Sequence, residues 1–354
     1  MLNAVTQLRR PGGPPSAAVR GAVAILSLVL LAGALSAHAQ AQQLRPFTFI
    51  LDFLPNGEYG PFFVALEKGW YAEEGLDVTI LRGTGSADTL RRVPAGQGDA
   101  GIGDFSAVVA ARSNDNVAVK AIMVYFRRPP HSIFVLGDSG IENAADLAGK
   151  TLATTAGNSH QILFPLLART AGFDHESVTW VTMDAGAMGP ALLLGRVDGA
   201  PFLANHEARL QDQAQGFGRT VRRISYADEG VDIYSFVIFA RDADIERNAD
   251  ALAAFLRATV RGIEYVFGQG RHEEAGQVVR RYNPEVDLNA AVGAARIAAT
   301  YAVTQEILDG SAAVGQFERD RTERSRDVYV EFLSLSRVVD IEELYTNELL
   351  PEVK

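Results

Sequence analysis

Apolar residues along the chain follow two alternating patterns. Short runs rich in β-branched and aromatic residues have the length of strands, and the stretches between them repeat apolar residues at three- and four-residue steps, as helices do. Strands that alternate with helices predict an α/β fold with two mainly parallel sheets. The expected strands are Phe47–Phe53, Leu76–Leu81, Ala100–Gly103, Lys120–Phe126, Ser132–Leu136, Thr151–Thr155, Val178–Met183 and Tyr234–Ala240.

Two of the helical stretches are well defined by their ends and faces. Pro61 opens and Gly69 closes the first, which matches the preference for proline in the first turn and glycine just past the last. The second is expected to bury one face in the core, because charged residues separate its regularly spaced apolar ones. Its apolar face is formed by Leu252, Phe255, Leu256, Val260, Ile263 and Phe267.

The chain is long enough for more than one hydrophobic core. Without the first 39 of its 354 residues the chain keeps about 315, which exceeds the size at which one core usually keeps growing, so two lobes are expected. Pro129–Pro130 interrupts regular structure, and the next comparable extended run begins at Tyr234, which gives two expected crossovers. Lobe one is then 44–128 plus 235–310, lobe two is 132–230, and the C-terminal helices 311–354 pack across the lobes. Two strands that link two lobes form a hinge, whereas the alternative is two consecutive domains joined once.

A short internal similarity aligns the two lobes. Gly96–Ala100 and Gly195–Gly199 each place a Gly-x-x-Asp turn before an expected strand. The motif is common in turns, so it serves only to match one lobe with the other.

Residues 1–39 are expected to be a signal peptide. Arginines up to Arg20 precede an apolar run from Gly21 to Leu35, which is too short to span a bilayer comfortably. Small residues follow at the spacing that a signal peptidase cuts, so cleavage is expected after Ala39 or Ala41. The alternative is a retained membrane anchor.

Charge and cysteine content limit the cellular compartments and the partner classes that are possible for this protein. Cleavage after Ala39 removes three Arg and no acid, which leaves 30 basic against 43 acidic residues and a formal charge of −13. Such a surface disfavours nucleic acid as a partner. Without any cysteine, an exported chain has no disulfide, no thiolate metal site and no lipid anchor on cysteine. We therefore expect a soluble periplasmic protein with no stable membrane insertion, no cofactor and no metal.

A set of short motifs along the expected mature chain is specific when taken jointly. They are Leu51–Asn56 with Tyr59, Ala65–Tyr71, Glu74–Val78, Gly101–Asp104, Ala145–Lys150, Leu192–Asp198 and Tyr234–Ala240. Together they resemble the periplasmic binding proteins of the sulfonate, nitrate and thiamine-precursor group. The resemblance implies a type II, Venus-flytrap fold, a small-molecule ligand held between the lobes, and an inner-membrane permease with a cytoplasmic ATPase as partners. It implies no enzymatic activity.

Two features within this resemblance are similar to the branch that binds pyrimidine precursors of thiamine. They are Leu51–Asn56 and the acidic Glu207 after the expected lobe-two strand. The chain departs from that branch at His206, where an aromatic residue is usual, and at Phe53, where tryptophan is more typical, and these changes leave the exact ligand open. The eukaryotic enzymes of the same fold carry a cysteine-rich motif, which this chain lacks.

Candidate ligand contacts lie in the loops after the strands, because ligands bind at the carboxyl ends of strands in open α/β sheets. The polar candidates are Asn56, Tyr59, Asp104, Asn158, Ser159, Glu207 and Asp232. The aromatic candidates are Phe62, Phe105, Phe202 and Tyr234. Glu207 suits an amino-substituted heterocycle, because a carboxylate can accept hydrogen bonds through both oxygens.

Each candidate also has a structural alternative. Asn56 can bond its own turn, Asp104 can cap a helix, and Glu207 can be a solvated acid at a helix start. Scattered phenylalanines are most often core. A metal held by His160, His206 and Glu207 is the least favoured alternative, since isolated histidines are usually surface or hydrogen-bonded groups.

Charge helps to choose between ligand classes. Two unit charges about 4 Å apart repel by about 4 kcal/mol at an effective dielectric of about 20, which is roughly a thousandfold in affinity. Glu207, Asp232 and Asp104 therefore favour a neutral or cationic aromatic ligand over a sulfonate or nitrate. A secreted enzyme is the alternative of another class, although no known nucleophile, metal or phosphate motif is present. A third alternative is a ligand sensor for a membrane receptor.

Export can be tested directly on the protein that accumulates outside the inner membrane. N-terminal sequencing of a periplasmic extract should give a chain that begins near Gln40 or Gln42, because the small residues before them fit a cleavage site. Recovery of the full-length chain in the membrane fraction would contradict the expected cleavage.

Overall fold

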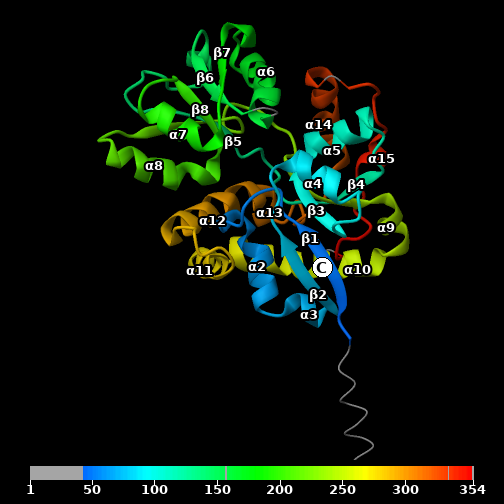
Figure 1. Ribbon diagram of the computed structural model, residues 1–354. Helices are drawn as coiled ribbons and strands as arrows, with labels where there is room; N and C mark the ends of the chain where they lie inside the picture. The colour runs from blue at the N-terminus through cyan, green and yellow to red at the C-terminus, as the bar shows by residue number, and fades with distance from the viewer. Residues whose placement is uncertain (1–42, 156–157, 334, 353–354) are drawn as a thin grey trace, which may run out of the picture. The chain divides into compact units, whose positions relative to one another are not determined.

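The computed structural model describes residues 43–155, 158–333 and 335–352. The expected signal peptide, residues 1–39, lies outside these ranges, as do Ala156 and Gly157 of one expected ligand loop. The described residues form two five-stranded sheets with helices around them (Figure 1). Within these ranges, no helix combines the length and apolar composition that crossing a bilayer requires.

The first sheet has the order β2-β1-β3-β10-β4. Strands β1 and β2 pair in parallel, β1 and β3 also pair in parallel, and β10 runs antiparallel to both of its neighbours. Four strands therefore point one way, and the reversed strand is the one that returns from the second sheet. The bounds are β1 Arg45–Ile50, β2 Leu76–Leu81, β3 Ala100–Asp104, β4 Val119–Val124 and β10 Phe236–Arg241.

The second sheet repeats this arrangement with the order β7-β6-β8-β5-β9. Strand β5 arrives from the first sheet and runs antiparallel to β8 and β9, whereas β6 is parallel to β7 and β8. The prediction of two mainly parallel sheets is confirmed. The bounds are β5 His131–Leu136, β6 Thr151–Thr154, β7 Thr179–Thr182, β8 Gly199–Leu203 and β9 Val221–Ser225.

Helices cover both sheets (Figure 1). In the first half of the chain they are α2 Gly60–Glu67, α3 Trp70–Glu73, α4 Ser86–Arg92, α5 Phe105–Asn114, α6 Ser159–Ala171, α7 Ala185–Leu193 and α8 Glu207–Gly216. In the second half they are α9 Asp242–Arg247, α10 Ala249–Ile263, α11 His272–Tyr282, α12 Leu288–Ala302, α13 Gln305–Leu308, α14 Arg319–Phe332 and α15 Ile341–Leu344. Short helical turns are η1 Gly57–Tyr59, η2 Ala144–Leu147, η3 His175–Ser177, η4 Ala204–His206 and the π-helical η5 Glu264–Gly268. Both helices predicted from the pattern are present as α2 and α10.

The internal similarity has the same structural role in both sheets. Asp99 accepts a hydrogen bond from the Thr48 amide at 2.7 Å, and Asp198 accepts one from the Thr151 amide at 2.8 Å. Each aspartate thereby ties the start of a strand to its neighbour. The two Gly-x-x-Asp turns are equivalent positions, as the sequence suggested.

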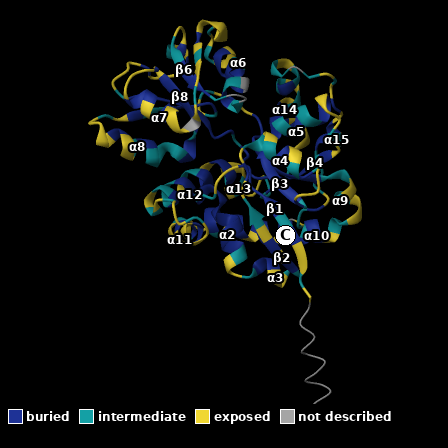
Figure 2. Cartoon of the chain, in the orientation of Figure 1, coloured by how far each residue is buried: buried dark blue, intermediate teal, exposed yellow. Residues whose placement is uncertain are grey.

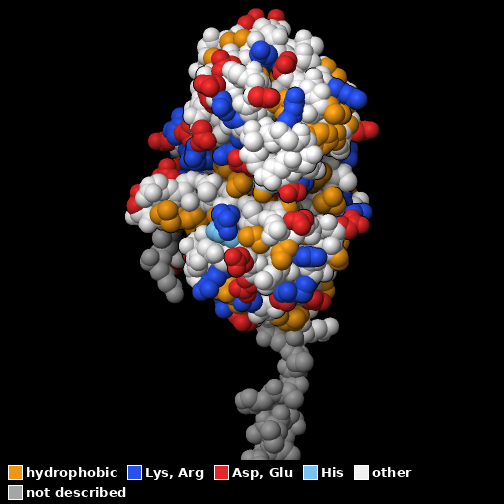
Figure 3. Space-filling model, turned by 90° about the vertical axis from the view of Figure 1, so that its left-hand side faces the viewer, with side chains coloured by type: hydrophobic (Ala, Val, Ile, Leu, Met, Phe, Trp, Pro, Cys, Tyr) orange, Lys and Arg blue, Asp and Glu red, His pale blue; other side chains and the backbone are white. Residues whose placement is uncertain are grey.

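Buried side chains form three clusters, and the strands lie at their centres (Figure 2). The first cluster packs the first sheet against α2, α10, α11 and α12. The second joins α4, α5 and the C-terminal α14 and α15 with α6. The third packs the second sheet against α7 and α8. The face drawn in Figure 3 mixes acidic and basic side chains.

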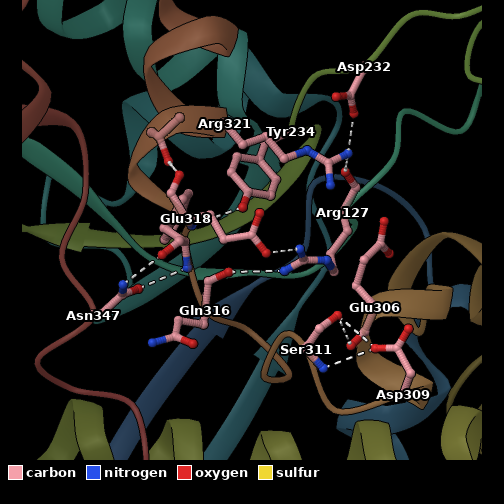
Figure 4. A network of polar contacts seen from close by, with 12 residues as sticks. Arg127, Asp232, Tyr234, Glu306, Asp309, Ser311, Gln316, Glu318, Arg321 and Asn347 are labelled. Atoms are coloured by element: carbon pink, nitrogen blue, oxygen red, sulfur yellow. Dashed lines mark hydrogen bonds and ion pairs between the residues drawn. The ribbon is translucent and has the colours of Figure 1, made fainter.

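Two segments, 125–130 and 226–235, connect the sheets, and neither carries a strand of its own. The C-terminal segment holds both (Figure 4). The Arg127 side chain, 1% exposed, pairs with Glu318 and donates to the Gln316 carbonyl. Arg321 donates to the Arg127 carbonyl at 2.7 Å and to Asp232 Oδ1 at 2.6 Å. Residues of both connections are thus bound to the start of α14.

Tyr234, in the second connection, is held at three points. Its amide donates to Ser325 Oγ at 3.0 Å, and its carbonyl accepts from the Tyr329 hydroxyl at 2.7 Å. Its own hydroxyl accepts from the Glu318 amide at 3.0 Å. The expected lobe boundaries remain a prediction, but the two connections that they require are present.

Replacing Tyr329 by Phe should destabilise the protein by about 1–3 kcal/mol, because it leaves the buried Tyr234 carbonyl without this donor. Urea unfolding measures the change in the free energy of unfolding. The matched control is Tyr282→Phe, since Tyr282 is 44% exposed and its loss should cost less than about 0.5 kcal/mol. Equal effects of the two substitutions would contradict the role given to Tyr329.

Candidate functional site

Four loops at the carboxyl ends of strands carry the candidate site. They follow β1, β3, β6 and β8, the positions at which open α/β sheets bind ligands. The loops after β1 and β3 belong to the first sheet, and those after β6 and β8 belong to the second. Contacts between the two pairs of loops define the site.

The loop after β1 buries an acid beside a tyrosine. Asp52 is 6% exposed and Tyr59 is 4% exposed, and the Tyr59 hydroxyl donates to Asp52 Oδ1 at 2.7 Å. Burial raises the pKa of Asp52 to about 7, although the bond from Tyr59 opposes this and the nearby Asp104 adds to it. The carboxyl is therefore poised between its neutral and ionised forms near neutral pH.

A glycine lets this loop lie directly on α12. A Cβ built on Gly57 would come within 1.8 Å of the Ala291 carbonyl oxygen, so no side chain fits there. The close approach fixes η1 and with it the next residue, Glu58, which is 5% exposed. The loop after β8 also packs against α12 through η4.

Glu58 and Asn205 face each other from the two sheets. Burial raises the pKa of Glu58 to about 7, and the Asn205 amide, which lies close to the carboxyl, opposes this rise. Asn205 is 5% exposed. Neither of its polar side-chain atoms makes a hydrogen bond of good geometry, and neither does Glu58 Oε2. Asn56 Oδ1, at the start of η1, is likewise buried without a partner.

Asp104 joins the loop after β3 to the second sheet. It caps α5, since its Oδ1 accepts from the Ser106 amide at 2.9 Å, and its Oδ2 accepts from the Ser235 hydroxyl at 3.0 Å. Burial raises the pKa of Asp104. The same Oδ2 lies 4.0 Å from His131 Nε2, which is 3.0 Å from Ser159 Oγ. Asp104 therefore acts both as the predicted helix cap and as a neighbour of the second sheet.

Two buried histidines sit side by side behind these contacts. The ring centroids of His131 and His160 are 4.6 Å apart, and His160 Nδ1 is 2.9 Å from Asn158 Oδ1. Burial lowers the pKa of His131 to about 3 and lowers that of His160 as well. Both rings are therefore neutral at physiological pH, and each leaves one buried nitrogen without a hydrogen-bond partner, Nδ1 of His131 and Nε2 of His160.

The predicted phenylalanines lie in the core. Phe62 is fully buried and stacks on Tyr125, with ring centroids 5.0 Å apart. Phe105 is fully buried against Phe317 and Tyr329. Phe202 is 8% exposed and packs on Phe134. Their positions agree with the alternative that the sequence left open, in which these rings are core.

The remaining predicted contacts have other partners. Glu207 Oε2 pairs with Arg223 Nε at 2.9 Å, and about a third of the Glu207 side chain is exposed. Asp232 is exposed and pairs with Arg321, and the Tyr234 ring lies beneath the Arg321 guanidinium. The structure thus places the side chains of Asp232 and Tyr234 in the C-terminal network.

Sequence reasoning missed Glu58, His131 and Asn205. Glu58 and Asn205 stand beside residues that the sequence already marked, Tyr59 in the first case and Glu207 in the second. No pattern, however, distinguishes a buried carboxyl or amide from an exposed one. His131 opens a strand whose inner face is otherwise apolar. A histidine directly after Pro129–Pro130, at the predicted crossover, was the available indication.

The arrangement suits a small polar molecule better than a metal. Among the described residues, no three His, Asp, Glu or Cys side chains lie close enough together to hold a metal ion. The unpaired atoms include the acceptors Glu58 Oε2 and Asn56 Oδ1 and both polar atoms of Asn205. A ligand that offers hydrogen-bond donors and acceptors along one edge can satisfy such a set.

Comparison with protein families gives a match over most of the described chain. The model of the family described as NMT1/THI5 like matches residues 56–271. The formylaminopyrimidine-binding protein of Halalkalibacterium halodurans is 28% identical over 246 residues, which cover 68% of this chain and 73% of that protein. The riboflavin-binding protein RibY of Chloroflexus aurantiacus is 24% identical and covers 87% of each chain. The 4-amino-5-hydroxymethyl-2-methylpyrimidine phosphate synthase of Legionella pneumophila is 26% identical over 68% of this chain and 74% of that enzyme.

Solved structures confirm the predicted fold class. The periplasmic aliphatic sulphonate binding protein SsuA of Escherichia coli superposes with a TM-score of 0.66 at 14% identity, covering 88% of this chain and 94% of that one. The periplasmic nitrate-binding protein NrtA of Synechocystis PCC 6803 gives 0.63 at 13% identity, with 87% of each chain covered. At these identities the likeness shows the periplasmic-binding-protein fold.

The raised pKa of Glu58 predicts a pH-dependent gain from Glu58→Gln in the ligand-free protein. The pKa of about 7 in the folded protein exceeds the ordinary glutamate value of 4.5, so the folded protein binds this proton more tightly than the unfolded chain. The free energy of unfolding therefore falls as the pH rises from about 4.5 to about 7. Above about pH 7 the full loss, up to about 3 kcal/mol, persists. Glu58→Gln removes the cost and should raise the melting temperature clearly at about pH 8 and little at about pH 5.

The control for this prediction is Glu74→Gln. Glu74 pairs with Arg257 on the surface, so its loss should change stability by less than about 1 kcal/mol at either pH. A Glu58→Gln variant that is less stable than the wild type at about pH 8 would show that the carboxylate is well compensated in the folded protein.

Proposed function

Because the chain belongs to the NMT1/THI5-like family, we propose that it is the solute-binding component of an ATP-driven importer. On this proposal it is exported, works in the periplasm and delivers its solute to an inner-membrane permease with a cytoplasmic ATPase. Two relatives that are named as binding proteins support a binding role. The fold of transport-associated binding proteins supports it as well.

The solute sits between the two sheets in this proposal. Lobe one, 44–128 and 235–310, contributes Asn56, Tyr59 and Asp104. Lobe two, 132–230, contributes Asn158 and Ser159. The 3.0 Å contact of Ser159 with His131, 4.0 Å from Asp104, supports this placement because it brings the two loop sets together. The connections 125–130 and 226–235 then form the hinge.

A neutral or cationic heteroaromatic solute of the pyrimidine kind fits the site best. The observation that carries this choice is the burial of Asp52, Glu58 and Asp104 close enough together that Asp104 raises the pKa of Asp52, and Asp52 that of Glu58. An anion brought beside these groups is repelled whenever any of them is ionised. A solute that donates hydrogen bonds to these carboxylates reduces the repulsion between them.

A small anion is the second candidate. The likeness to the sulphonate- and nitrate-binding structures favours it, but that likeness shows the fold alone. The buried histidines His131 and His160 bring no positive charge to an anion, because their lowered pKa values keep them neutral.

An enzymatic role has support only from the names of some relatives, which are pyrimidine phosphate synthases. The eukaryotic enzymes of the same fold carry a cysteine-rich motif, and this chain has no cysteine. Binding without turnover is therefore the function that we propose.

A thermal-shift screen separates the solute classes. The panel is 4-amino-5-hydroxymethyl-2-methylpyrimidine, riboflavin, taurine and nitrate, each added to the mature protein. A ligand at about 100 times its dissociation constant adds about 2.7 kcal/mol of stability, so the pyrimidine should raise the melting temperature by several degrees. Stabilisation by nitrate or taurine alone would contradict the proposed solute class and favour the anion-binding alternative.

A further inference from the structure

Glu58 and Asn205 lie close together, and they keep hydrogen-bonding capacity beyond this mutual contact. Each is 5% exposed, and Glu58 Oε2, Asn205 Oδ1 and Asn205 Nδ2 all lack a partner of good geometry. Buried polar atoms without partners are rare in folded proteins, because each loses its bonds to water and gains none in return. Three such atoms on two facing side chains therefore indicate a place where another molecule binds.

The two residues are also positioned to act together. Glu58 lies in η1 after β1 of the first sheet, and Asn205 lies in η4 after β8 of the second. Both turns pack against α12, and Gly57 allows η1 to lie directly on its backbone. One helix thus sets the distance between a carboxyl from one sheet and an amide from the other.

We propose that Glu58 and Asn205 together recognise the hydrogen-bonding edge of the solute. In this assignment, which rests on the proposed function, the Glu58 carboxylate accepts a bond from an exocyclic amino group or a ring N–H. The Asn205 amide bonds the adjacent ring nitrogen or carbonyl, for which it has both a donor and an acceptor. The solute class is therefore a planar heteroaromatic that carries an N–H donor next to an acceptor, as aminopyrimidines and flavins do.

Glu58 takes the role that the sequence suggested for Glu207. The Glu207 carboxylate is already paired with Arg223 at 2.9 Å and is about one third exposed, so much of its capacity is used or solvated. The Glu58 carboxyl has no basic partner among the contacts of the described residues, and a donor from the solute would be its strongest partner. A charge-assisted bond in a buried site is stronger than one at the surface.

Titration calorimetry at about pH 8, where the carboxyl is ionised, tests the assignment with two ligands. One is 4-amino-5-hydroxymethyl-2-methylpyrimidine, and the other is the same ring with hydrogen in place of the 4-amino group. Glu58→Gln should lower the affinity for the amino ligand by about ten- to a hundredfold, as expected for a bond to a charged group. It should leave the affinity for the deaminated ligand nearly unchanged. Asn205→Ala should lower the affinity for both ligands, because both keep the ring nitrogen.

Two further variants and one further ligand test whether the loss of affinity is specific to Glu58. Glu74→Gln is the matched control and should bind as the wild type does, because Glu74 lies just before the amino end of β2 and is paired with Arg257. Glu207→Gln is the competitor and should lose less than Glu58→Gln for the amino ligand. If riboflavin is the ligand that binds, 3-methylriboflavin replaces the deaminated ring as the partner without the N–H donor.

The outcomes distinguish this assignment from the proposed function. If Glu58→Gln loses the same affinity for both ligands, or loses none, the assignment is overturned while solute binding stands. Additive effects of the substitution and of the missing amino group mean that the two do not contact each other. A larger amino-specific loss in Glu207→Gln moves the recognition to Glu207. A wild type that binds only nitrate or taurine, or none of the panel, overturns both proposals.

Discussion

A carboxyl group that leaves water must be paired, hydrogen-bonded or protonated, and this constraint organises the candidate site. Asp104 meets it with two serines and a helix amide, and Asp52 meets it with the Tyr59 hydroxyl. Glu58 has the Asn205 amide close by, but its Oε2 makes no hydrogen bond of good geometry. The first two acids are therefore parts of the scaffold that hold loops in place, whereas the third retains capacity for an outside partner.

The alternation of strands and helices predicted the fold well, because it depends on local patterns. The strand at Leu76–Leu81 and the amphipathic helix around Leu252–Ile263 appear where the pattern placed them. Strand β9 was missed, since Arg222 and Arg223 at its centre interrupt the apolar run. Such a strand forms because β5 beside it supplies the hydrogen bonds, which is a tertiary contact that no window of sequence contains.

The sequence predicted which loops form the candidate site better than it predicted which residues of those loops take part. Asp104 and Ser159 were identified because strand ends and helix starts can be recognised locally. Glu58 and Asn205 were missed because their burial arises only when two turns meet α12, more than eighty residues along the chain from either. Phe62 and Phe105 were predicted as candidates because composition cannot tell a ring in the core from a ring that meets a ligand.

The hold of α14 on both connections restricts the mechanical freedom of the protein. Arg321 fastens the first connection through the Arg127 carbonyl, and Tyr329 fastens the second through the Tyr234 carbonyl. Rotation of one sheet against the other about the line through these two attachments would keep both hydrogen bonds, whereas twisting or sliding would break them. In the proposed hinge, α14 therefore favours rotation over the other movements.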